Sequence, residues 1–174
     1  MRKLLSLMLA LAIVTSISAV ALADTYGLGV DSYYYAGHSR EATAEAAGVG
    51  EIDVTMCALV LNEVGKIEFV NFDVVQAKVT FTAEGKLTVD PEAVILTKKE
   101  LGDAYNMRRV SPIGKEVYEQ IEFLEAWCIG KTVEEVVTNA ITSGDNADVD
   151  LIAGCTITVD DFIRALVKAA ENAK

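Results

Sequence analysis

Histidine, proline and cysteine are scarce in this 174-residue chain, which contains one, two and three of them respectively. The lone histidine, His38, lies in a polar stretch typical of a surface loop. The sequence therefore offers neither a metal-binding constellation nor a Ser-His-Asp or Cys-His catalytic set. Cys57, Cys128 and Cys155 form an odd set without close spacing, which argues against a disulfide framework, although one pair could still form a bridge.

Basic residues are also few. The chain has 15 Lys and Arg against 26 Asp and Glu, a formal net charge of −11. Nucleic acids require basic patches that neutralise phosphates, so this balance argues against a nucleic-acid partner. It argues equally against an anionic membrane surface. The acidic composition is typical of a soluble protein whose molecules repel one another.

The first 23 residues are similar to a secretory signal peptide. Two basic residues are followed by an uncharged apolar run over 4–14, and the small-x-small pattern over 21–23 suits a signal peptidase. Cleavage before Asp24 is predicted. The alternative is an uncleaved anchor, because residues 4–23 approach the ~20 residues that span a bilayer. The remainder, 24–174, has the length of a single domain, which we expect to be exported and either secreted or associated with the cell envelope.

Strand patterns come first in this domain. Residues 52–61 alternate in hydrophobicity, with a turn over 62–65 in which Gly65 can take a positive φ. A change of parity in the returning strand predicts a bulge near Phe69. Residues 37–50 are predicted to be a loop. The predicted strands cover 28–35, 52–61, 66–76, and a further hairpin formed by 78–82 and 86–89.

Helical patterns follow. Ser111 and Pro112 predict the start of a helix that ends before Gly130. Its apolar stripe consists of Ile113, Val117, Ile121, Leu124 and Cys128. Thr132 and Glu135 predict a capping box for a second helix, and Thr158 and Asp161 predict a cap for the last one. Strands followed by helices predict an α+β fold, in which an antiparallel sheet of hairpins packs against C-terminal helices.

The junction at 150–158 is the segment best suited to ligand chemistry. A helix start offers N–H groups and the positive end of the helix dipole to an anion. Gly154 would let a ligand approach the backbone, and Thr156 adds a hydroxyl at the same place. An ordinary corner before a helix, which binds nothing, is the alternative.

This segment resembles the C-terminal motif of the FMN-binding domain family. That family includes flavin-carrying subunits of ion-pumping NADH:quinone and ferredoxin:NAD reductases and exported flavoproteins of extracellular electron transfer. Its motif is Asp, two residues, then Ser/Thr-Gly-Ala-Ser/Thr, whose last residue is esterified to FMN phosphate in many members. Here Asp150, Gly154 and Thr156 match, whereas Ala153 and Cys155 stand at the first Ser/Thr and at the alanine. The likeness in layout extends over residues 28–170.

The resemblance implies a site for FMN. Thr156 would hold the phosphate, covalently or by hydrogen bonds, and Gly154 with the N–H groups of Ile157 and Thr158 would cradle it. Asp150 would orient the phosphate loop or serve the flavin transferase through a metal, and Ala153 and Cys155 would complete the loop. A second segment, Leu101-Gly102, matches the family's flavin-side loop, so the candidates for the flavin-ring wall are Leu101, Gly102, Tyr105 and Met107. The alternative for these four is packing in the core, which is favoured for Met107.

The implied function is electron carriage by an exported flavoprotein, served by a membrane redox donor and a flavin transferase. Such a protein is a redox carrier rather than an enzyme that turns over a substrate. Two alternatives stay open. One is a degenerate family member without flavin that acts as a secreted binding module, which Ala153 and Cys155 favour. The other is an unrelated secreted enzyme using acidic pairs such as Asp160-Asp161, although these are typical of helix N-terminal charges.

Overall fold

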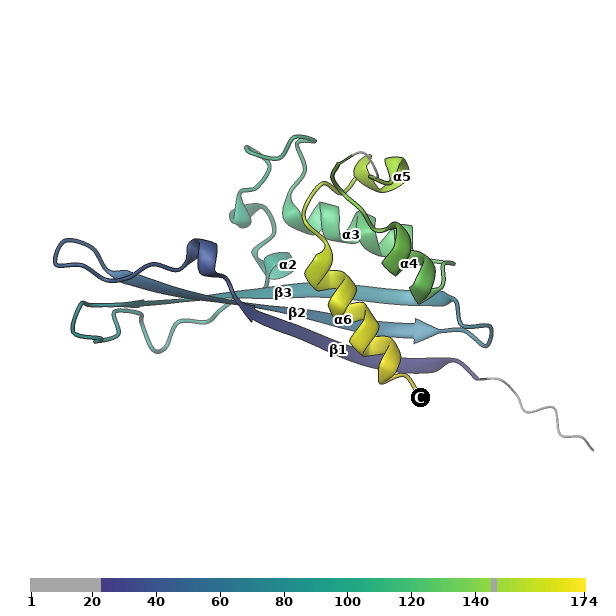
Figure 1. Cartoon of the computed structure of the whole chain (residues 1–174), viewed down its shortest axis with the longest axis horizontal. Coiled ribbons are helices and arrows are strands. Elements are labelled where there is room, and N and C mark those ends of the chain that lie inside the picture. Colours follow the sequence, from purple (N-terminus) through teal and green to yellow (C-terminus); the bar gives the residue numbers. More distant parts are fainter. Residues whose placement is uncertain (1–22, 145–146) are drawn as a thin grey trace, which may run out of the picture.

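A computed structural model describes residues 23–144 and 147–174 (Figure 1). The predicted signal segment and its membrane-anchor alternative fall, apart from residue 23, outside the described residues. Within the described part, none of the helices combines the length and the apolarity required to cross a bilayer.

Three long strands form one antiparallel sheet in the order β1-β2-β3. The strands are β1 (Thr25–Tyr34), β2 (Gly48–Leu61) and β3 (Ile67–Phe81), each longer than predicted. The Asn62 carboxamide accepts hydrogen bonds from the amides of Val64 and Lys66 and thereby shapes the β2–β3 turn. Gly65 takes a φ of 76°, as predicted.

The predicted bulge is confirmed at the same end of the sheet. Val60 pairs with Phe69 and Leu61 pairs with Ile67, so Glu68 is the extra residue on β3. The predicted 78–82/86–89 hairpin is wrong as a pair of strands, because residues 78–81 belong to β3. The segment after the turn pairs with β3 through an isolated bridge between Phe81 and Leu87 and through hydrogen bonds from the Thr82 amide to the Lys86 carbonyl oxygen and from the Thr88 amide to the Thr80 carbonyl oxygen.

The C-terminal half is helical. Its elements are α2 (Lys98–Leu101), η2 (Gly102–Tyr105), α3 (Val117–Cys128), α4 (Val133–Asn139), α5 (Val149–Ile152) and α6 (Asp160–Glu171), and a short η1 (Ala36–His38) follows β1. The Thr132–Glu135 capping box of α4 is confirmed. These elements and the sheet together confirm the predicted α+β fold.

Two predicted helix starts are wrong. The helix predicted from Pro112 starts at Val117, because the Glu116 carboxylate caps it in a box with Glu119. For α6 the N-cap is Val159 and makes no side-chain cap hydrogen bond. The Asp161 carboxylate instead accepts a hydrogen bond from Thr55 Oγ1 on β2, at 2.7 Å, so a contact to the sheet takes the place of the cap.

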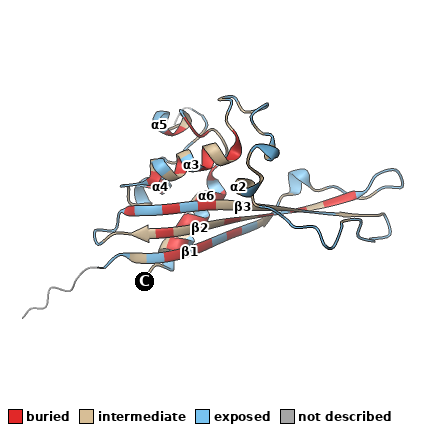
Figure 2. Cartoon of the chain, turned by 180° about the vertical axis from the view of Figure 1, so that it is seen from behind, coloured by how far each residue is buried: buried red, intermediate tan, exposed pale blue. Residues whose placement is uncertain are grey.

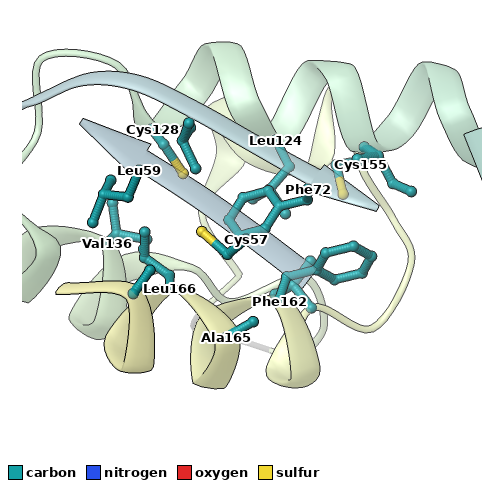
Figure 3. Close-up of a cluster of buried hydrophobic side chains, with 14 of the residues drawn as sticks. Cys57, Leu59, Phe72, Leu124, Cys128, Val136, Cys155, Phe162, Ala165 and Leu166 are labelled. Atoms are coloured by element: carbon teal, nitrogen blue, oxygen red, sulfur yellow. The ribbon is translucent and has the colours of Figure 1, made fainter. Parts of the chain in front are cut away.

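The helices α3, α4 and α6 cover one face of the sheet and bury the core against it (Figure 1). Phe72 of β3 meets Phe162 of α6 edge to face, with ring centroids 5.5 Å apart. The three cysteines are free and buried among these side chains. Figure 3 labels Cys57, Leu59, Phe72, Leu124, Cys128, Val136, Cys155, Phe162, Ala165 and Leu166 of this core.

The backbone of α6 lies directly on β1. A Cβ built at Gly27 would lie 1.9 Å from the carbonyl oxygen of Ala169, and one at Gly29 would lie 2.0 Å from that of Ala165. At the edge of the same strand, Asp31 accepts hydrogen bonds from Arg164 and Lys168 at 2.7 and 2.8 Å. Burial alone would raise the pKa of the Asp31 carboxyl, but these hydrogen bonds outweigh it and lower the pKa.

Candidate functional site

A pocket of about 430 Å³ opens between the sheet, the start of α6 and the 105–107 loop. It is the hollow in which buried carboxylates meet residues of the predicted FMN site. A larger hollow of about 510 Å³ lies between loops 39–42 and 81–85 and contains none of the predicted site residues. The 430 Å³ pocket is lined by Tyr33, Tyr35, His38, Asp53, Gln76, Lys98, Tyr105, Met107, Val117, Thr156, Ile157, Thr158, Asp161 and Phe162.

Five of the residues predicted for the FMN site line this pocket. Tyr105 comes from η2, and Thr156, Ile157 and Thr158 come from the segment that enters α6. Residues 51 positions apart in the sequence therefore line the same pocket. Met107, which was also predicted for the flavin-ring wall, is the fifth.

The remaining predicted residues lie away from the pocket lining. Leu101 and Gly102 are half-buried in the turn between α2 and η2, and Asp150 and Ala153 are exposed on and beside α5. Gly154 is buried, and a Cβ there would lie 2.2 Å from a ring carbon of Phe123, so this ring fills the space in front of it.

Cys155 is fully buried next to Gly154. Burial raises the pKa of its thiol to about 11, which keeps the sulfur protonated at neutral pH. This cysteine is therefore a packing residue of the core.

Gln120 of α3 fixes the position of Thr156. Its Oε1 accepts hydrogen bonds from the Thr156 amide at 2.9 Å and from the Thr156 hydroxyl at 3.2 Å. Its Nε2 donates to Ser111 Oγ and to the Lys115 carbonyl oxygen. The side chain is 1% exposed, so these bonds form in a site shielded from water. Sequence reasoning missed Gln120, although it is a polar residue within the apolar stripe of a helix.

Glu116 fixes the position of the 105–108 loop, as Gln120 fixes that of Thr156. Its carboxylate accepts hydrogen bonds from the amides of Met107 and Arg108 at 2.8 and 3.0 Å. The side chain that caps α3 therefore also ties the 105–108 loop to the start of that helix. Residues at the start of α3 therefore hold both the 105–108 loop and the Thr156 segment.

Three carboxylates lie on the pocket side of β2 and α6, and they belong to Glu51, Asp53 and Asp161. Glu51 accepts hydrogen bonds from His38 and Gln76, and its Oε2 lies 3.3 Å from Lys78 Nζ, an ion-pair distance without hydrogen-bond geometry. Burial alone would raise the pKa of Glu51, but its contacts with His38 and Lys78 lower it. Within the described residues, no group of three or more His, Cys, Asp or Glu side chains is placed to hold a metal ion.

Asp53, like Glu51, has one buried oxygen without a hydrogen-bond partner among the described residues, but Asp53 also lines the pocket. It is 3% exposed, the oxygen without a partner is Oδ1, and its Oδ2 lies 3.8 Å from Lys98 Nζ. Burial raises the pKa of this carboxyl, and the nearby Glu51 and Asp161 charges add to the rise, while Lys98 opposes it. A buried acceptor without a partner is costly, so the Asp53 side chain favours a ligand that offers an N–H or O–H group.

Aromatic rings make up much of the remaining wall. The ring centroids of Tyr33 and Tyr35 lie 5.9 Å apart, those of Tyr35 and His38 lie 4.2 Å apart with the rings tilted, and Lys98 Nζ lies 5.6 Å from the centroid of Tyr105. Burial and the charges of Asp161 and Asp53 raise the pKa of Tyr33 to about 12, so its phenol stays neutral. The pocket thus combines flat apolar surfaces with a hydroxyl-bearing edge at 156–158.

Comparison with known proteins gives one informative similarity. No family model and no solved structure matches the chain. The chain is 30% identical over 196 residues to a protein named chlorophenol reductase from Desulfitobacterium hafniense. The similarity covers 85% of this chain and 58% of the reductase, so the chain spans little more than half the length of that relative. The chain is therefore a distant homologue of this reductase over most of its own length.

Proposed function

We propose that the pocket binds FMN and that the protein carries electrons outside the cytoplasmic membrane. The observation that carries the proposal is the convergence of Thr156, Tyr105 and the unpartnered Asp53 on one pocket. The distant homology to a reductase supports a redox-related role. Bound FMN supplies one- or two-electron chemistry, so no catalytic base or nucleophile is required of the protein.

The residues present fit the chemistry of this cofactor. A volume of about 430 Å³ lies within the roughly 300–1,000 Å³ range of small-molecule sites. The tyrosine rings suit a flat heteroaromatic ring, because stacked aromatic pairs contribute about 0.5–1.5 kcal/mol beyond burial. The carboxylate of Asp53 lines the pocket and is an acceptor for a ring N–H group, which an isoalloxazine carries.

Thr156 is the residue proposed to hold the phosphate. Its hydroxyl donates to Gln120 Oε1 in this structure, so holding a phosphate oxygen, which accepts hydrogen bonds, requires the hydroxyl to turn its proton from Gln120 to the phosphate. Ile157 and Thr158 continue the same edge and lead towards the first turn of α6, where Asp160 and Asp161 reduce the positive potential. Binding of the phosphate at this edge therefore depends on the hydroxyl and on the backbone more than on the helix dipole. Covalent attachment at Thr156 by a flavin transferase belongs to the same proposal.

The alternative function is a flavin-free binding module of the same fold. Two observations favour it: Ala153 and Cys155 depart from the family motif, and the Phe123 ring occupies the space in front of Gly154. Flavin binding distinguishes the two functions directly.

Titration of the purified full chain with FMN, followed by flavin fluorescence, tests the proposal. The wild type is expected to quench the fluorescence, and Tyr105→Ala is expected to weaken binding about tenfold, since it removes one stacking surface. Tyr34→Ala is the matched control, because Tyr34 is 80% exposed and does not line the pocket. Absence of quenching by the wild type, or equal weakening by both variants, would contradict FMN binding in this pocket.

A further inference from the structure

One face of the sheet is not covered by any of the residues that the structure describes. We call it the outer sheet face and define it by five cross-strand rows: Tyr26-Val60-Phe69, Leu28-Ala58-Asn71, Val30-Met56-Asp73, Ser32-Val54-Val75 and Tyr34-Ile52-Ala77. Figure 2 views the molecule from behind, where the strands lie in front of α6. Tyr26, Leu28 and Tyr34 are 64%, 72% and 80% exposed.

The inner side of β2 is polar over part of its length, although its outer side is apolar throughout. The side that faces the helices carries the buried Glu51, Asp53 and Thr55 before the core residues Cys57 and Leu59, whereas the outer side carries Ile52, Val54, Met56, Ala58 and Val60. A solvated face of an antiparallel sheet usually carries polar residues instead. The outer sheet face therefore has the composition of a buried surface.

Charge is nearly absent from this face. Asp73 is the single charged residue among its five rows, in a chain of which 24% is charged. Its Oδ1 accepts hydrogen bonds from the amides of Val74 and Lys99 at the sheet edge. A surface without charges offers nothing to an oppositely charged partner, but it is complementary to another copy of itself.

The area of the face is that of a small dimer interface. Three strands spaced about 4.8 Å apart and ten paired residues long make a flat rectangle of about 14 by 33 Å, or roughly 460 Å². This is below the roughly 800 Å² per partner of a standard interface and falls in the range of small, reversible complexes, which bury less than about 1,200 Å² in total.

The relief of the face also suits contact between two copies. Leu28 stands between two shallow hollows of about 380 and 350 Å³ and lines both of them. In a two-fold contact each copy presents the same ridge and the same hollows, so the Leu28 side chains can fill hollows of the opposite copy. We propose that the outer sheet face is the contact surface between two copies of this chain, packed sheet against sheet.

Sedimentation velocity of the full chain tests the dimer. A dimer is expected at micromolar concentration, and it should strengthen as salt rises, because salt screens the repulsion between two acidic chains while the contact itself contains almost no charge. A monomer at up to about 100 times that concentration, or a dimer that dissociates with salt, would overturn the proposal.

Leu28→Lys locates the contact. It should shift the dissociation constant at least about 100-fold towards monomer, since it places a charge in an apolar interface. Because lysine reduces the net negative charge, general repulsion cannot explain the dissociation. Val110→Lys is the control, with the same charge change at a residue that is 75% exposed and outside the face. Val30→Lys is a second disrupting variant, and circular dichroism checks that each variant is folded.

The outcomes separate the proposal from its rivals. A dimer that persists in both folded face variants would place the interface elsewhere and overturn the proposal. A wild-type monomer that binds neutral phospholipid vesicles through Leu28 would show a lipid-facing surface instead. None of these results depends on flavin, so failure of the FMN proposal leaves the test intact.

Discussion

Gly29→Ala is expected to destabilise the fold by about 3 kcal/mol. The added methyl group would lie 2.0 Å from the Ala165 carbonyl oxygen and 2.5 Å from the Ala169 amide nitrogen. Both atoms belong to the backbone of α6, so no side-chain rotation can make room and the helix has to move away from β1. That movement would also disturb Asp161 and Phe162, which line the pocket.

Gly50→Ala is the matched control for this effect. Gly50 lies in β2, takes no positive φ, and has nothing within 4 Å of the position that an added methyl group would take. Its replacement is expected to leave the free energy of unfolding within about 0.5 kcal/mol, or to raise it slightly, since alanine restricts the unfolded chain. Urea denaturation measures both variants. Equal stabilities for the two would show that α6 does not rest directly on β1.

Gln120→Leu is expected to cost about 2–3 kcal/mol and to release the Thr156 segment. The leucine fills a similar volume but leaves the Thr156 amide and the Lys115 carbonyl oxygen without their partner in a buried place. Hydrogen exchange at the Thr156 amide should accelerate well beyond the change expected from the loss of global stability. FMN binding should weaken along with it, because the phosphate edge is no longer held.

Glu122→Leu controls for a change to leucine on the same helix, since Glu122 is exposed on α3. It should change the stability by less than about 0.5 kcal/mol and leave exchange at Thr156 unaltered. If Gln120→Leu gives the same exchange rate at Thr156 as wild type, Gln120 is a packing residue and does not position the site.

Much of the fold follows from local signals in the sequence. The alternation over 52–61, the turn at Gly65, the parity change near Phe69 and the Thr132–Glu135 capping box each depend on neighbouring residues, and each was predictable for that reason. The start of α3 was not predictable from local signals. A Ser-Pro pair is a common helix start, but the buried Glu116 carboxylate, which also binds the 107–108 amides, moved the start to Val117.

The site was less predictable because its contacts are distant in sequence. Thr156 and Gln120 are separated by 36 positions, and Thr55 and Asp161 by 106. The alternation of β2 shows that two faces exist but does not show that the more polar one faces the helices. Asp53 was therefore missed, since only the tertiary structure reveals that its carboxylate is buried beside Glu51 and Asp161.

The most direct test of the proposed function is intact-protein mass spectrometry of the chain produced with its N-terminal segment in a host that contains a flavin transferase. The expected result is a mass increase of one FMN minus water, located on the peptide that contains Thr156 and absent from Thr156→Ala, with Thr158→Ala modified as in wild type. An unmodified mass in a protein that also fails to bind free FMN would contradict the flavoprotein proposal and favour the binding module. A flavin that remains attached to Thr156→Ala would contradict the assignment of the site.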